Sequence, residues 1–208
     1  MSFQRDNMTT LFFGTDIDIL KEYKSRHSAR DILEVADCDT LLNTIKELDA
    51  YVIVSDYDSV SHSINKMLAS NTLPESVIVL ERVPELVTGK MLISKGVKAY
   101  GNSRMLKLHY DQMLQTVIDG KIWTYPELTI ALAKEAKRST LSQEAEALIE
   151  HRLTEKEKEV VYAILEGLTN DAIASELDIT LRTVKAHISS IFTKLHINDR
   201  VSLILLLK

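Results

Sequence analysis

Cysteine, proline and glycine are scarce in this chain, and each scarcity excludes a class of protein. The 208 residues contain 1 Cys, 3 Pro and 6 Gly, with 45% hydrophobic and 26% charged residues. So little Gly and Pro excludes collagen-like and wholly disordered chains. Cys38 is alone and cannot form an internal disulfide, and the N-terminal residues lack the basic and then apolar pattern of a secretory signal, so we expect a cytoplasmic protein.

Long apolar runs and an excess of positive charge are missing as well. The longest runs, such as LILLL at 203–207, fall far below the roughly 18–20 residues that span a bilayer, so we expect no membrane partner. The formal net charge is −5, which excludes a protein that coats nucleic acid through bulk positive charge. A nucleic-acid site must therefore be local.

Short apolar runs alternate with amphipathic segments between residues 10 and 110. The segments have the helical spacing of apolar residues, as in Asp18–Ser25, Thr40–Leu48 and Ser59–Ser70. The runs have the length and β-branched content of buried strands: Leu11–Gly14, Ile32–Val35, Tyr51–Val54, Val77–Leu80 and Val97–Tyr100. The alternation predicts an α/β domain over residues 1–130, with a five-stranded, doubly wound parallel sheet.

Polar residues follow these strands at the edge where ligands gather in such sheets. They are Thr15 and Asp16 after the first strand, Asp56 after the third, Glu81 after the fourth and Ser103 after the fifth.

The second half shows no strand pattern. Residues 131–152 are rich in Ala, Glu and charge without Gly or Pro, which predicts a helical linker, and residues 153–208 predict an all-helical domain. Residues 1–150 carry 17 basic and 22 acidic side chains, whereas 151–208 carry 8 of each. The whole net charge therefore belongs to the first part.

The helical domain has the spacing of a helix-turn-helix. Thr154 and Glu157 form a capping-box pattern, Gly167 ends the first helix, Thr169 or Asn170 caps the second, and Thr180 caps the third. In the third helix one apolar stripe is predicted to be buried: Val184, Ile188, Ile191 and Leu195. The opposite stripe is small or cationic and free of acid, as a major-groove helix requires: Arg182, Lys185, Ala186, Ser189 and Thr193.

The segments LTEKEKEVV, EGLTNDAIASEL and TLRTVKAHISSIFTKL resemble the signature of the LuxR-type four-helix DNA-binding domain. With the α/β half, the chain resembles a NarL/FixJ-type response regulator, in which a flavodoxin-like receiver domain precedes that domain. The resemblance implies a transcription regulator that binds a two-fold double-stranded DNA site as a homodimer. It places Lys185, Ala186 and Ser189 on the bases and Asn170, Thr183 and Lys194 on phosphates, with Arg182 adding charge. The fourth helix, Asn198–Leu207, would dimerise through Val201, Ile204 and Leu205.

The receiver half departs from the family at positions that handle phosphate. The family's acidic pair is reduced to Thr15 and Asp16, Glu81 stands where a hydroxyl is expected, and Ser103 replaces the lysine. Asp56 is the candidate phosphoacceptor. We therefore expect phosphorylation-independent or atypical regulation. Two alternatives stay open: conventional activation at Asp56 by a sensor kinase with Mg²⁺, or a pseudo-receiver that senses a ligand or another protein.

KIWTYPEL resembles the end of the same receiver family, and a subset that binds cyclic di-GMP has arginine in the corresponding loop. This chain lacks that arginine, so Trp123 and Tyr125 are expected to pack instead. The sequence contains no P-loop, no G-x-S-x-G motif and no metal-binding spacing of His or Cys. We expect neither an enzyme nor a bound cofactor or metal.

Overall fold

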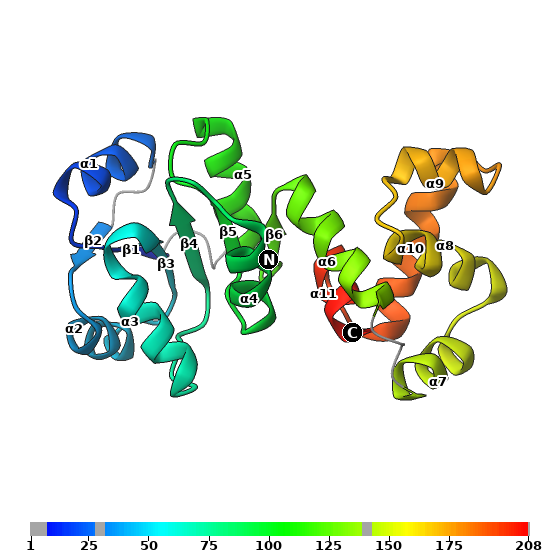
Figure 1. Cartoon of the computed structure of the whole chain (residues 1–208), viewed down its shortest axis with the longest axis horizontal. Helices are drawn as coiled ribbons and strands as arrows, with labels where there is room; N and C mark the ends of the chain where they lie inside the picture. The colour runs from blue at the N-terminus through cyan, green and yellow to red at the C-terminus, as the bar shows by residue number, and fades with distance from the viewer. Residues whose placement is uncertain (1–7, 28–31, 139–142, 208) are drawn as a thin grey trace. The chain divides into compact units, whose positions relative to one another are not determined.

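Residues 8–27, 32–138 and 143–207 are described in the structure, a computed structural model. The chain divides into two units, Met1–Trp123 and Thr124–Lys208 (Figure 1). Each unit has buried apolar side chains of its own.

The apolar runs of the first unit form a sheet in the order β2-β1-β3-β4-β5-β6. Its strands are β1 Thr9–Phe13, β2 Ile32–Val35, β3 Tyr51–Asp56, β4 Val77–Glu81, β5 Ala99–Asn102 and β6 Trp123–Thr124. The first five pair in parallel, which confirms the predicted doubly wound sheet. The predicted number of five was too low, because the two residues of β6 are too few to show a periodic pattern.

The fifth strand begins later than its apolar run predicted. Val97 is fully buried, but its N–H donates to the Leu92 carbonyl at 3.1 Å and so closes the end of the preceding helix. Gly96 supplies the positive φ of 103° that this turn requires. The backbone of Val97 therefore belongs to the turn, and β5 starts at Ala99.

Helices cover both faces of the sheet. On one side lie α1 (Ile17–Arg26) and α5 (Lys107–Ile118), and on the other α2 (Cys38–Thr44), the short 3-10 helix η1 (Ile45–Glu47), α3 (Tyr57–Ala69) and α4 (Leu86–Ser94) (Figure 1). The α1–α5 side holds a continuous core that includes Phe12, Tyr23, Val54, Leu80 and Met113. Trp123 packs against this core, as expected from its sequence context.

Apart from Thr124, which belongs to β6, the second unit contains helices as its regular elements, as predicted. It contains α6 (Pro126–Arg138), α7 (Gln143–Arg152), α8 (Glu155–Leu165), α9 (Asn170–Glu176), α10 (Leu181–Leu195) and α11 (Arg200–Leu206). The capping box of Thr154 and Glu157 begins α8, and the side chains of Thr169, Thr180 and Asp199 accept backbone N–H bonds that begin α9, α10 and α11. Helices α8, α9 and α10 pack on one another as a helix-turn-helix.

The segment predicted as a linker belongs to this second unit. Helix α6 packs on α11 and α8 through buried side chains of Leu128, Leu132 and Ala133, and α7 buries Ala145 and Ile149. The division therefore falls between residues 123 and 124, and not around the predicted linker at 131–152. The many charged residues at 131–152 favoured the linker prediction, because the buried apolar side of these helices is narrow. Among the described residues, no helix has the length and apolar character needed to cross a membrane.

Candidate nucleic-acid interface

One side of α10 presents exposed side chains without an acid. Its opposite side is anchored by Val184, Ile191 and Leu195, which are buried in the unit, while Ile188 is half-buried. This burial turns the predicted contact side outward, and its exposed members are Arg182, Lys185, Ala186, Ser189 and Thr193. The sequence-predicted base-facing residues thus share one accessible face, which we call the α10 stripe.

The expected phosphate contacts Thr183 and Asn170 lie at helix N-termini. The Thr183 N–H donates to the Thr180 hydroxyl at 3.1 Å, and the two threonine hydroxyls lie 2.8 Å apart. Asn170 is the first residue of α9, and its Oδ1 accepts a long bond of 3.5 Å from the Arg200 guanidinium. Helix N-termini favour anions, so both positions suit phosphate, although both side chains already have partners within the domain.

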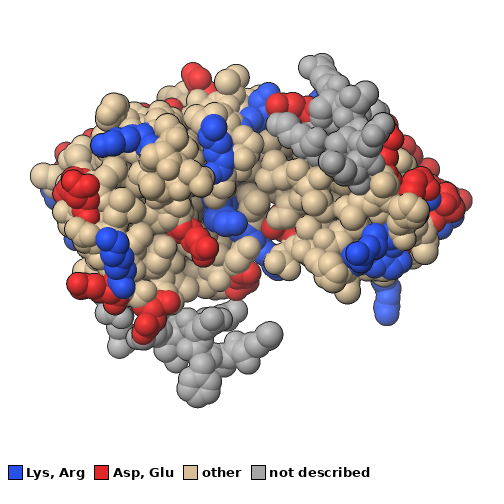
Figure 2. All heavy atoms as spheres, turned by 90° about the horizontal axis from the view of Figure 1, so that it is seen from below, with Lys and Arg blue, Asp and Glu red and all other residues tan. Residues whose placement is uncertain are grey.

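Positive charge without neighbouring acid in the same helix is a feature of α10. On the face shown in Figure 2, Lys and Arg side chains are interspersed with Asp and Glu over the N-terminal unit. Helix α10 carries Arg182, Lys185 and Lys194 and contains no Asp or Glu. The sequence prediction of a local cationic helix on an acidic protein matches this distribution.

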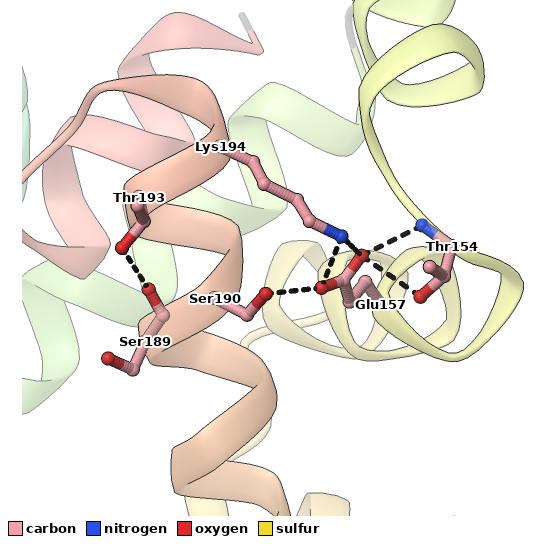
Figure 3. A network of polar contacts seen from close by, with 6 residues as sticks. All are labelled: Thr154, Glu157, Ser189, Ser190, Thr193 and Lys194. Carbon is pink, nitrogen blue, oxygen red and sulfur yellow. Dashed lines mark hydrogen bonds and ion pairs between the residues drawn. The ribbon is translucent and has the colours of Figure 1, made fainter.

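Lys194 does not extend freely toward solvent. Its ammonium donates to both carboxylate oxygens of Glu157, at 2.9 and 2.6 Å, and its side chain is 36% exposed (Figure 3). Glu157 also accepts from the Ser190 hydroxyl at 2.6 Å and from the N–H and hydroxyl of Thr154 at 2.8 and 2.9 Å. The residue expected on a DNA phosphate therefore joins α10 to the start of α8.

The network keeps Glu157 ionised. Burial raises the pKa of this carboxyl, but the hydrogen bonds from Lys194, Ser190 and Thr154 outweigh burial and lower the pKa to about 2. The sequence predicts only the capping role of Glu157. Its hydrogen bonds with Ser190 and Lys194 could not be predicted, because these two residues lie on a helix distant in the chain.

The apolar residues of α11 expected to dimerise are largely covered within the chain. Val201 is 5% exposed and Ile204 is fully buried, whereas Leu205 is half-buried. Helix α6 packs against α11, so part of this covering comes from the segment that was predicted to be a linker.

At the carboxyl edge of the sheet, Asp56 is the last residue of β3. It is 1% exposed, and neither carboxylate oxygen has a hydrogen-bond partner among the described residues. Burial raises its pKa, the neighbouring Ser59 side chain lowers it in part, and the charges of Asp58 and Asp16 raise it further. Thr15 is exposed and donates its N–H to the Ser59 hydroxyl at 3.1 Å.

Glu81 ends β4 and Ser103 follows β5, and their side chains have different surroundings. The Tyr100 hydroxyl donates to Glu81 and accepts from the Glu85 N–H at 2.9 Å. Ser103 is 1% exposed, its hydroxyl has no partner among the described residues, and its carbonyl accepts from Arg26. The sequence predicts Tyr100 only as part of a strand, and it does not predict the hydrogen bond from the Tyr100 hydroxyl to Glu81.

These residues do not fit a magnesium site. The Asp16 carboxylate caps α1 by accepting from the N–H groups of Asp18 and Ile19 at 3.0 and 3.2 Å, and Glu81 is bonded to Tyr100. Within the described ranges, no three His, Cys, Asp or Glu side chains are grouped as metal ligands.

Comparisons with known proteins match both a C-terminal segment and most of the chain. Residues 151–207 match the family model of bacterial regulatory proteins, luxR family. The chain is 27% identical over 183 residues to the glycerol metabolism activator of Pseudomonas putida, covering 84% of this chain and 81% of that protein.

Two other similarities have higher identity over shorter segments. The chain is 48% identical over 54 residues to the transcriptional regulatory protein LiaR of Bacillus subtilis, and 40% identical over 68 residues to the response regulator protein VraR of Staphylococcus saprophyticus. These matches span 26% and 32% of those proteins. Among solved structures, the RcsB response regulator of Salmonella typhimurium aligns with a TM-score of 0.48 at 19% identity, over 95% of this chain and 96% of that one.

Proposed function

We propose that this chain, whose residues 151–207 match the luxR family of bacterial regulatory proteins, is a sequence-specific regulator of transcription that binds double-stranded DNA. The observation that carries the proposal is the α10 stripe, an exposed acid-free helix side within the family-matched segment. We assign base contacts to Lys185, Ala186 and Ser189, and phosphate contacts to Arg182, Thr183 and Asn170.

The protein acts as a homodimer on a two-fold site. Each copy places α10 in a major groove, and the two grooves lie about 34 Å apart along the duplex. Such a regulator works in the cytoplasm and catalyses no reaction of its own.

Its regulation does not depend on phosphorylation of Asp56. Three features support this: the Glu81 carboxylate stands at the end of β4, Ser103 stands where the family has lysine, and the carboxylates at this edge are not grouped to hold Mg²⁺. A transferred phosphoryl group would meet negative charge at Glu81 without a neutralising metal.

The test is selection of duplexes from a random-sequence DNA library by the full chain, with and without prior incubation with Mg²⁺ and acetyl phosphate. We expect one enriched two-fold motif, the same affinity in both arms and no phosphoryl mass on the intact protein. Failure to enrich any motif would refute DNA binding. Stoichiometric phosphorylation of Asp56 that tightens binding would refute the proposed mode of regulation and establish the conventional one.

A further inference from the structure

The contacts of Glu157 link the helix that meets DNA to the first helix of the domain. Glu157 is 4% exposed on the first turn of α8, and its two oxygens together accept five hydrogen bonds from Thr154, Ser190 and Lys194. A buried carboxylate that is this fully bonded fixes the groups around it, because any shift leaves a charge without partners.

Ser190 and Lys194 lie four residues apart and so share one side of α10. Figure 3 shows that they point toward Glu157, whereas Ser189 and Thr193 lie on the other side of the helix. The network therefore restrains the rotation of α10 about its axis, in addition to the buried Val184, Ile191 and Leu195, and with it the direction in which the α10 stripe faces.

From this geometry we propose that Glu157 and Lys194 are positioning residues, which orient the α10 stripe toward DNA while Lys194 itself neutralises no phosphate. This proposal rests on the proposed function. It reassigns Lys194, which the family resemblance placed on phosphate.

Salt dependence separates the two roles of a cation. Affinity falls as salt rises, and each phosphate that a protein cation neutralises contributes about 0.9 to the steepness of this fall of log K with log salt concentration, which we call the slope. The probe is the duplex enriched by the wild-type chain, and the variants are Lys194→Gln, Glu157→Gln, their combination and Arg182→Gln. Lys156→Gln is the matched control, since Lys156 pairs with Glu159 at 2.8 Å on the exposed surface of α8.

We expect Lys194→Gln and Glu157→Gln each to weaken binding about tenfold, as members of one network do, with the slope unchanged. The combined variant should bind no more weakly than either single variant. Arg182→Gln should lower the slope by about 0.9, and Lys156→Gln should leave both affinity and slope unchanged.

Other results overturn the proposal. A slope lowered by about 0.9 in Lys194→Gln would make Lys194 a phosphate contact. Tighter binding by Glu157→Gln would mean that Glu157 withholds a DNA-binding cation. If Glu157→Gln unfolds, the variants Lys194→Arg and Ser190→Ala test the proposal instead. Lys194→Arg should retain the affinity for DNA, and Ser190→Ala should lose part of that affinity at unchanged slope. Loss of affinity in Lys194→Arg with full affinity in Ser190→Ala would refute the positioning role. If the wild-type chain enriches no duplex, the proposed function fails as well.

Discussion

Neutralising Glu157 should remove a large, pH-dependent part of the stability of the C-terminal unit. The pKa of this carboxyl falls from 4.5 to about 2 on folding. A shift of this size corresponds to about 3 kcal/mol of unfolding free energy at neutral pH. Because the folded-state pKa is the lower one, the stabilisation is complete above pH 4.5 and is lost as the pH falls through 2.

The assay is urea unfolding of the wild type and of Glu157→Gln, followed by far-ultraviolet circular dichroism at several pH values. The difference between the two proteins should be about 3 kcal/mol at pH 7 and should shrink toward zero near pH 2, where the wild-type carboxyl is itself protonated. Glu159→Gln is the control, because its pair with Lys156 is exposed and worth at most about 1 kcal/mol. A difference that stays constant with pH would refute the role of the charge.

Two further variants test other parts of the molecule. Asp56→Asn should stabilise the N-terminal unit at pH 7 by about 1–3 kcal/mol, because it removes a buried charge without hydrogen-bond partners. Because the pKa of Asp56 is raised in the folded state, this gain in stability should fade as the pH falls below the folded-state pKa. Unfolding of the N-terminal unit can be followed by the fluorescence of Trp123, the only tryptophan of the chain. A gain in stability that grows in acid would contradict the assignment. Leu132→Glu should detach α6 from α11 and increase self-association in analytical ultracentrifugation, whereas Lys134→Glu, on the exposed side of α6, should not. The same degree of self-association in the wild type and both variants would show that α6 does not limit dimerisation.

Much of the fold could be predicted because local patterns agreed with the final packing. The strand at 32–35 and the helix caps at Thr154 and Thr180 follow from a few neighbouring residues. The stripe of α10 follows from helical spacing alone. Such features need no knowledge of distant parts of the chain.

The rest depends on contacts between distant segments. The burial of Leu128 and Leu132 is decided by α8 and α11, and the pairing of Lys194 is decided by Glu157 on another helix. The hydrogen bond between Tyr100 and Glu81 joins two neighbouring strands. The sequence gives the residue types at these positions, but their partners are known only from the tertiary structure.

The binding of the enriched duplex by Lys185→Ala, compared with Lys156→Ala, tests DNA recognition by α10 most directly. Lys185 is the exposed lysine of the α10 stripe, and Lys156 is an exposed lysine of the same unit on α8. A lost base contact should weaken binding by about 1–3 kcal/mol and relax the sequence preference at one position of each half-site. Lys156→Ala should bind like the wild type. Equal affinity and equal sequence preference in all three proteins would contradict the recognition surface assigned to α10.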